Sequence, residues 1–91
     1  MPFDAADFLK TPEEVADYLE EAFADGDPAF IAAALGDAAR ARGMAKIASE
    51  TGLSRESLYR ALSKDGNPEL TTVMKVIAAL GLRLKAVEPA A

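Results

Sequence analysis

Residues 44–63, MAKIASETGLSRESLYRALS, constrain the fold of this chain more than any other stretch. The first half contains a helix face whose members recur at the i, i+3, i+4 and i+7 spacing: Met44, Ile47, Ala48 and Thr51. Ala48 is small, which allows a second helix to approach closely. Gly52 can adopt the positive φ that ends a helix and begins a tight turn. The pattern therefore predicts a short helix that stops at this glycine.

A second helix is predicted directly after the turn. Leu53 would fill the corner between the two helices, and Ser54 is a favourable N-cap for a helix that begins at Arg55. The buried stripe of this helix would consist of Leu58, Ala61 and Leu62. Two helices joined by a glycine also occur in small domains that bind nothing. The joint pattern favours a helix-turn-helix, whose second helix enters the DNA major groove and contacts base edges with its N-terminal residues.

The outward face of this second helix is suited to nucleic acid. Its members can contact bases and phosphates: Ser54, Arg55, Glu56, Tyr59, Arg60 and Ser63. The turn that follows, KDGNP, lies next to the predicted helix. Lys64 and the backbone N–H groups near Gly66 and Asn67 are therefore placed to meet a phosphate. Such contacts would position the protein rather than select a sequence.

The composition argues against an enzyme and against a membrane protein. The 91 residues suffice for one domain with a modest core, and no stretch approaches the roughly 20 apolar residues that span a bilayer. The chain has no histidine and no cysteine, so the usual metal ligands, nucleophile and general base are missing. We expect a cytoplasmic protein without a secretion signal, a disulfide, a metal or a cofactor.

The net charge of −5 is unusual for a DNA-binding protein, but the charge is unevenly distributed. Residues 1–42 hold three basic and ten acidic side chains, whereas residues 43–91 hold seven basic and five acidic ones. The sequence thus joins an acidic N-terminal part to a mildly basic part that contains the predicted helix-turn-helix.

Two helices are predicted in the acidic part. Residues 11–14, TPEE, form a capping-box signal for the first helix, and residues 27–28, DP, repeat the cap-and-proline signal for a second helix that reaches about Arg42. The inner faces would be Val15, Tyr18, Leu19, Ala22 and Phe23 in the first helix, and Phe30, Ile31, Ala34, Leu35 and Ala38 in the second. Residues 1–10 have no clear period and are predicted to form an extended arm.

The first of these helices has an acidic outer face, made by Glu13, Asp17, Glu20, Glu21 and Asp25. One interpretation is a solvated surface, which is usual for charged helix faces. The other is a docking face for a basic protein partner, because complementary potentials steer association and fix orientation. The sequence leaves both interpretations open.

The C-terminal part predicts one more helix and a strand. The helix would begin at Thr71 or Thr72 and end at Gly81, with an apolar face of Val73, Val76, Ile77 and Leu80. Residues 82–87, LRLKAV, alternate apolar and basic side chains up to Ala86, as a strand does. Since no second strand is visible, the simplest partner is the same segment of a second copy, and the alternative is a disordered tail. The dimer contacts would be Leu82, Leu84 and Ala86.

Nearly the whole chain resembles one family of regulatory proteins. The segments that carry the resemblance are FDAADFL, TPEEVADYL, IASETGLSRESLYRALS and GNPELTTVMKVIAALGLRL. They are similar to the addiction-module antidote proteins, the HigA-like antitoxins of type II toxin–antitoxin modules, within the lambda-repressor-like (XRE-type) helix-turn-helix proteins. One departure is Met44, which stands where related repressors often have a glutamine that braces the recognition helix.

The resemblance implies an all-α fold. We expect a five-helix lambda-repressor-like helix-turn-helix domain with an extra N-terminal helix and a short C-terminal strand that pairs across a dimer. The expected organisation is an acidic arm and helix in residues 1–26, the DNA-binding domain in residues 27–81, and a dimerisation strand and tail in residues 82–91.

The resemblance also implies a function, that of a dimeric antitoxin which binds a RelE/ParE-like toxin and represses its own operon at a palindromic operator. Carried onto this sequence, the DNA-binding residues are Ser54, Arg55, Glu56, Tyr59, Arg60 and Ser63, with Lys46 and Lys64 on phosphates. The toxin contacts have no motif to carry over, and we assign them to the N-terminal region as a hypothesis: Phe3, Phe8, Tyr18 and Glu21. The alternative is a free-standing phage-type repressor without a toxin partner.

Overall fold

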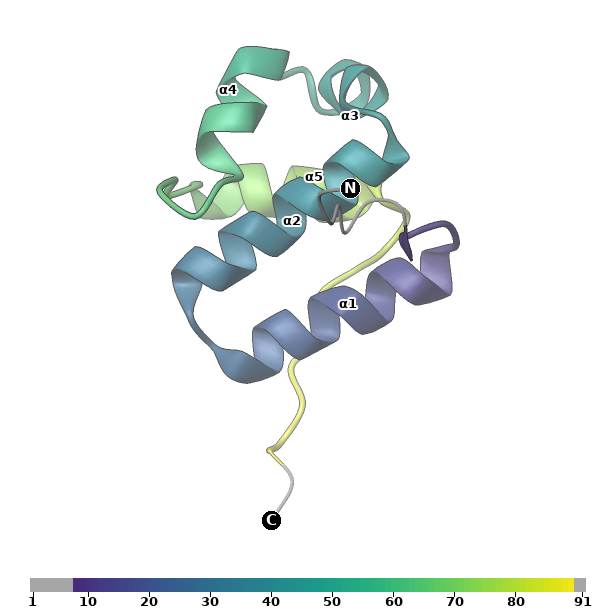
Figure 1. The fold of residues 1–91 in the computed structure, drawn as a ribbon, viewed down its shortest axis with the longest axis vertical. Helices are drawn as coiled ribbons and strands as arrows, with labels where there is room; N and C mark the ends of the chain where they lie inside the picture. The colour runs from purple at the N-terminus through teal and green to yellow at the C-terminus, as the bar shows by residue number, and fades with distance from the viewer. Residues whose placement is uncertain (1–7, 90–91) are drawn as a thin grey trace, which may run out of the picture.

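The computed structural model describes residues 8–89, which form five α-helices and no strand. The helices are α1 (Pro12–Asp25), α2 (Pro28–Arg42), α3 (Met44–Thr51), α4 (Arg55–Ala61) and α5 (Leu70–Ala79). Figure 1 shows α1 at one end of the molecule and α3 and α4 at the other, with α2 and α5 between them. The all-helical class and the five helices expected from the sequence are confirmed. None of the helices in this described part has the length and apolar character that crossing a bilayer requires.

The predicted capping signals of α1 and α2 are both present. Thr11 Oγ1 accepts the backbone N–H of Glu14 at 3.1 Å, and the Glu14 carboxylate accepts the backbone N–H of Thr11 at 2.9 Å. At α2, the Asp27 carboxylate accepts the N–H of Ala29 at 3.0 Å. A proline occupies the first turn of each helix, where its missing N–H leaves no hydrogen bond unmade. Both helices therefore begin where the sequence predicts.

The core joins all five helices. Four fully buried side chains come from four different helices: Leu35 of α2, Ile47 of α3, Leu58 of α4 and Val76 of α5. α1 packs on α2 and adds Leu19 and Ala22 to the same cluster. Fully burying an aliphatic side chain of this size contributes about 1.5–3 kcal/mol to folding, before the entropy of ordering it is subtracted. α3 and α4 are thus each anchored to the body by a central apolar residue.

Two aromatic residues predicted on inner faces are instead substantially exposed. Phe23, in the last turn of α1, is 37 % exposed, and Phe30, in the first turn of α2, is 43 % exposed. Both are within three residues of the connection between α1 and α2, and this connection lies at the edge of the molecule (Figure 1). The prediction was wrong because the spacing identifies a helix face but not how far along that face the neighbouring helices reach.

α5 begins at Leu70, one residue before the earlier of the two predicted starts. Its N-cap is Glu69, which has extended backbone angles (φ −66°, ψ 154°) and makes no side-chain hydrogen bond to the helix. The sequence therefore carries no side-chain capping signal that marks the start of this helix. The helix therefore starts from backbone conformation alone.

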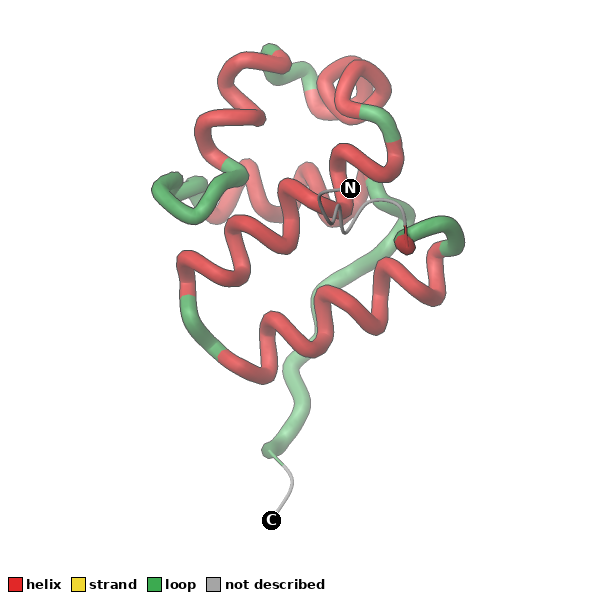
Figure 2. The backbone as a smooth tube through the Cα atoms, in the orientation of Figure 1, coloured by secondary structure: helices red, strands yellow, loops and turns green. Residues whose placement is uncertain are grey.

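Residues 82–89 form an irregular segment that leaves the body of the molecule (Figure 2). The Leu82 N–H donates to Ile77 O at 3.1 Å, and the Leu82 side chain packs against the core. Leu84 and Ala86 are exposed. Pairing across a dimer involves a second chain, so the C-terminal strand stays a prediction, as do the predicted domain limits.

Candidate functional site

α3, α4 and the turn between them form what we call the α3–α4 corner, which is held by contacts around Gly52. Gly52 has φ 76°, a left-handed conformation that glycine adopts without steric penalty, and its N–H donates to Ala48 O at 2.9 Å. The buried Thr51 hydroxyl donates to Ile47 O at 2.7 Å and accepts the Leu53 N–H at 3.3 Å. These contacts fix the turn and therefore the direction in which α4 leaves α3.

Ser54 caps the first turn of α4, as predicted. Its Oγ accepts the backbone N–H of Ser57 at 3.0 Å and donates to Ser57 Oγ at 2.8 Å. Leu58 is fully buried and Ala61 is half-buried. α4 therefore has one side in the core and one side in solvent, which is the division that the sequence predicts.

The solvent-facing side of α4 brings four predicted DNA-binding residues together. Arg55, Glu56, Tyr59 and Arg60 are all exposed, with 46 % of Tyr59 accessible. Neither Arg55 nor Arg60 forms an ion pair with any residue between 8 and 89. Their guanidinium groups are therefore available to acceptors outside the described part of the chain.

The remaining predicted contacts lie at the edges of the corner. Ser63 is half-buried and its Oγ donates to Arg60 O at 3.1 Å, so this hydroxyl, like that of Ser54, already has a partner within the protein. Lys46 on α3 and Lys64 after α4 are exposed. Ser57 was not predicted as a functional residue, although its position three residues after the Ser54 cap could have indicated the hydroxyl pair.

An open hollow of about 550 Å³ with mixed polar and apolar lining lies between α4 and the start of α5. Ser57 and Arg60 line it on the α4 side, and residues 65–69 with Thr72 line it on the other side. This hollow places Arg60 beside the turn that was predicted to meet a phosphate. No cluster of side chains in residues 8–89 could hold a metal ion.

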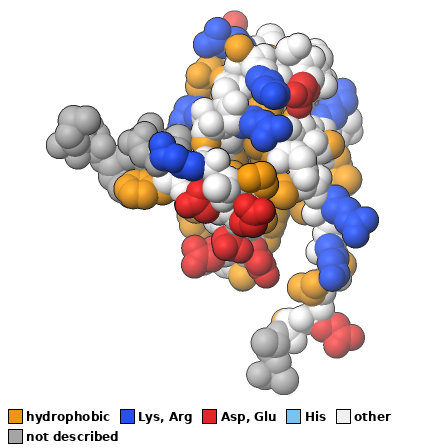
Figure 3. Space-filling model, turned by 90° about the vertical axis from the view of Figure 1, so that its right-hand side faces the viewer, with side chains coloured by type: hydrophobic (Ala, Val, Ile, Leu, Met, Phe, Trp, Pro, Cys, Tyr) orange, Lys and Arg blue, Asp and Glu red, His pale blue; other side chains and the backbone are white. Residues whose placement is uncertain are grey.

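α1 presents an acidic surface at the other end of the molecule. It has six carboxylates and no basic residue, and all six are exposed: Glu13, Glu14, Asp17, Glu20, Glu21 and Asp25. In Figure 3, Asp and Glu side chains gather on the lower half of the molecule, and most Lys and Arg side chains lie above them or on the C-terminal segment. The acidic and basic side chains, which are unevenly distributed along the sequence, are thus also separated in space.

Three of the predicted toxin contacts line one open hollow beside α1. Phe8, Tyr18 and Glu21 border this hollow of about 620 Å³, together with Leu9 and further α1 residues. Phe8 is 62 % exposed, whereas Leu9 is buried. The fourth predicted contact, Phe3, lies outside the described residues. The structure therefore brings an aromatic surface and carboxylates together at this place.

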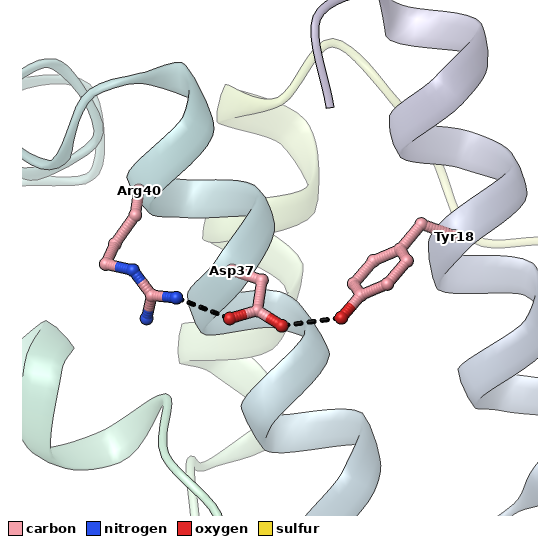
Figure 4. A network of polar contacts seen from close by, with 3 residues as sticks. All are labelled: Tyr18, Asp37 and Arg40. Atoms are coloured by element: carbon pink, nitrogen blue, oxygen red, sulfur yellow. Dashed lines mark hydrogen bonds and ion pairs between the residues drawn. The ribbon is translucent and has the colours of Figure 1, made fainter. Parts of the chain in front are cut away.

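Tyr18 also joins α1 to α2 through a polar network that the sequence analysis missed (Figure 4). The Tyr18 hydroxyl donates to Asp37 Oδ2 at 2.6 Å, and Arg40 Nη2 donates to the other oxygen, Asp37 Oδ1. Burial raises the pKa of Tyr18 to about 12; the hydrogen bond and the charge of Asp37 act in the same direction, and the charge of Arg40 opposes them. The signal in the sequence was Asp37 itself, the one acidic residue of the alanine-rich α2.

Comparison with known proteins identifies the family. Residues 1–88 match the family described as probable addiction module antidote protein, and the chain belongs to that family. It is also 49 % identical over 83 residues to an uncharacterized protein of Haemophilus influenzae, a match that covers 91 % of this chain and 86 % of the relative. No solved structure gives a significant match. Membership confirms the expected antidote family and implies a toxin as partner.

Proposed function

We propose that this protein is the DNA-binding antitoxin of a type II toxin–antitoxin module. In this proposal the α3–α4 corner is a helix-turn-helix that binds the operator of its own operon, and α1 binds a RelE/ParE-like toxin. One observation carries the proposal: Arg55, Tyr59 and Arg60 are exposed on α4, while Leu58 of the same helix is buried in the core. The antidote family supplies the functional context.

The side chains on α4 suit base recognition. A bidentate contact from Arg55 or Arg60 to O6 and N7 of a guanine would contribute about 1–3 kcal/mol of discrimination against the wrong base. Lys46 and Lys64 would bind phosphates, which adds affinity without sequence preference. The other proposed contacts at the operator are Ser54, Glu56, Tyr59 and Ser63.

We expect the operator-bound form to be a dimer, because the few cations of one corner give a single protomer little affinity for DNA. Two copies related by a two-fold axis would place their α4 helices in half-sites about one helical turn, roughly 34 Å, apart. Residues 83–89 are exposed and belong to no helix, which supports this arrangement, since such a segment can form a strand with its copy. The dimer contacts would be Leu82, Leu84 and Ala86.

α1 is the proposed toxin-binding surface. Its exposed carboxylates would attract a basic protein, and the hollow beside Phe8, Tyr18 and Glu21 would receive an apolar side chain of that protein. Exposed ion pairs contribute little individually, so the apolar contact is expected to supply most of the affinity and the carboxylates most of the orientation. A free-standing repressor would need no such surface, and the family match favours the antitoxin over that alternative.

Co-expression and DNA binding test the two halves of this proposal separately. We expect a neighbouring reading frame to encode a small basic protein that arrests growth, and co-expression of this chain to restore growth. We also expect the purified chain to bind the duplex upstream of its own gene more tightly than a scrambled duplex. Growth arrest that persists would refute the antitoxin role, and equal affinity for both duplexes would refute operator recognition.

A further inference from the structure

Two glycines lie against the backbone at the C-terminal end of α4, and neither has a positive φ. Gly36, in the middle of α2, lies so close to Leu62 that an added Cβ would be 2.2 Å from Leu62 O. Gly66, in the loop after α4, lies so close to Ala61 that an added Cβ would be 2.2 Å from Ala61 O. Both contacts are to backbone carbonyls, which cannot rotate away as a side chain can.

Backbone conformation does not explain these glycines. Gly36 belongs to a regular, alanine-rich helix, where alanine is the better helix former. Gly36 is also buried, so access of water to the backbone is not a reason for glycine at this position. Close approach of α4 to α2 is the remaining physical reason for glycine at this position. A Cβ there would displace the end of α4 by a distance on the order of 1 Å, judged by ordinary van der Waals separations.

We propose that Gly36 and Gly66 are positioning residues that together set the sequence preference of DNA binding. Gly36 sets where the end of α4 lies on α2, and Gly66 sets where the turn after α4 lies against the end of that helix. This inference rests on the proposed function, because it assumes that α4 contacts base edges. Hydrogen bonds to bases need donor–acceptor distances of about 2.7–3.2 Å and weaken when the helix moves. Attraction between cations and phosphates falls off slowly with distance, so the same displacement should leave it nearly unchanged.

The two glycines should therefore affect specific and non-specific binding differently. Gly36→Ala and Gly66→Ala should each weaken binding to the preferred duplex about fivefold or more, the equivalent of one bidentate base contact. In Gly36→Ala, binding to a scrambled duplex should change less than about twofold, since it depends on phosphate contacts. Gly66→Ala also alters the turn that is predicted to meet a phosphate, so both of its affinities should fall, the specific one more. A merely structural role would lower both affinities together, in proportion to the fraction of unfolded protein.

The experiment uses the full chain and a duplex that the wild-type protein selects from a randomised library. Both affinities are measured for the wild type, Gly36→Ala and Gly66→Ala at a temperature where circular dichroism shows each to be folded. Ala22→Gly is the stability control, because Ala22 is buried in α1, whose main packing partner is α2. Its ratio of specific to non-specific affinity should equal that of the wild type.

The outcomes separate this inference from the proposed function. A lower ratio in both glycine variants, with an unchanged ratio in Ala22→Gly, supports the positioning role. A wild-type ratio in Gly36→Ala, or an equal loss of both affinities, overturns it while leaving operator binding intact. If the wild-type protein selects no sequence from the library, the proposed DNA-binding function is itself refuted.

Discussion

The Tyr18 hydroxyl donates to Asp37 Oδ2 at 2.6 Å and so joins α1 to α2 across their packed surfaces (Figure 4). Asp37 also accepts from Arg40, so its carboxylate has one donor from each of the two helices. Apolar contacts such as that of Leu19 hold α1 on the body, but they are not directional. The polar contact therefore fixes the position of α1 on α2 more closely than burial alone.

Removing the Tyr18 hydroxyl should weaken this attachment. We expect Tyr18→Phe to lower the free energy of unfolding by about 1 kcal/mol, because the variant loses one hydrogen bond and leaves Asp37 with one donor fewer. Urea unfolding followed by circular dichroism measures the change. Tyr59→Phe is the matched control, since Tyr59 is exposed. An equal effect of the two variants would mean that the hydrogen bond does not contribute.

The same residue predicts a loss of stability at alkaline pH. The pKa of Tyr18 is raised to about 12 in the folded chain, against about 10 in an unfolded chain. The unfolded chain therefore loses its proton first, and the stabilisation is complete below about pH 10 and declines as pH rises through about 12. Urea midpoints across this range should fall more steeply for the wild type than for Tyr18→Phe. An equal decline of the urea midpoint in the wild type and in Tyr18→Phe would contradict the raised pKa of Tyr18.

The capping box of α1 should contribute measurably to stability. Thr11→Ala removes the acceptor for the Glu14 N–H, and loss of an N-cap of this kind costs about 1 kcal/mol. Glu14→Ala removes the reciprocal contact, so the effects of the two substitutions should be less than additive in the double variant. Thermal unfolding of the wild type, Thr11→Ala, Glu14→Ala and the double variant gives the double-mutant cycle. Thr71→Ala, at an exposed position of α5, should have little effect.

The arginines of α4 should control operator affinity. We expect Arg55→Ala and Arg60→Ala each to weaken binding to the preferred duplex by about 1–3 kcal/mol and to relax the preference at one base pair of each half-site. Titrations against single-substituted duplexes measure both effects. Lys10→Ala removes the same charge at a position before α1 and should alter affinity much less. Unchanged preference in both arginine variants would mean that another surface recognises the bases.

The C-terminal segment should control the oligomeric state. Leu84→Glu places a charge on the side of residues 82–86 that is proposed to pair, so the variant should sediment as a monomer and protect a single half-site in footprinting. Val87→Glu is the control, because Val87 would lie on the same side of the strand as Arg83 and Lys85, opposite to Leu84. A dimer that survives Leu84→Glu would place the interface elsewhere.

Local signals in the sequence predicted most of the fold. The Thr11 and Asp27 caps, the Ser54 cap and the Gly52 turn depend on residues close together in the chain, and each is present in the structure. The start of α5 was missed by one residue because its N-cap, Glu69, uses no side chain.

Features that depend on distant residues were not predictable in the same way. The exposure of Phe30 depends on how far the other helices extend, and the Tyr18–Asp37 bond joins residues 19 positions apart. The close packing of Gly36 was not predicted because it depends on Leu62, which lies at the end of another helix. The exposed side of α4 was predicted correctly because helical periodicity alone separates it from the buried Leu58.

The separation of the α1 carboxylates from the α3–α4 corner gives the folded chain an electric dipole moment. In the field of a polyanion such a molecule experiences a torque even where its net charge is repelled. It would turn α1 away from the duplex and the corner towards it before any contact forms. Adding salt would shorten the range of that alignment, because it screens the field of the duplex.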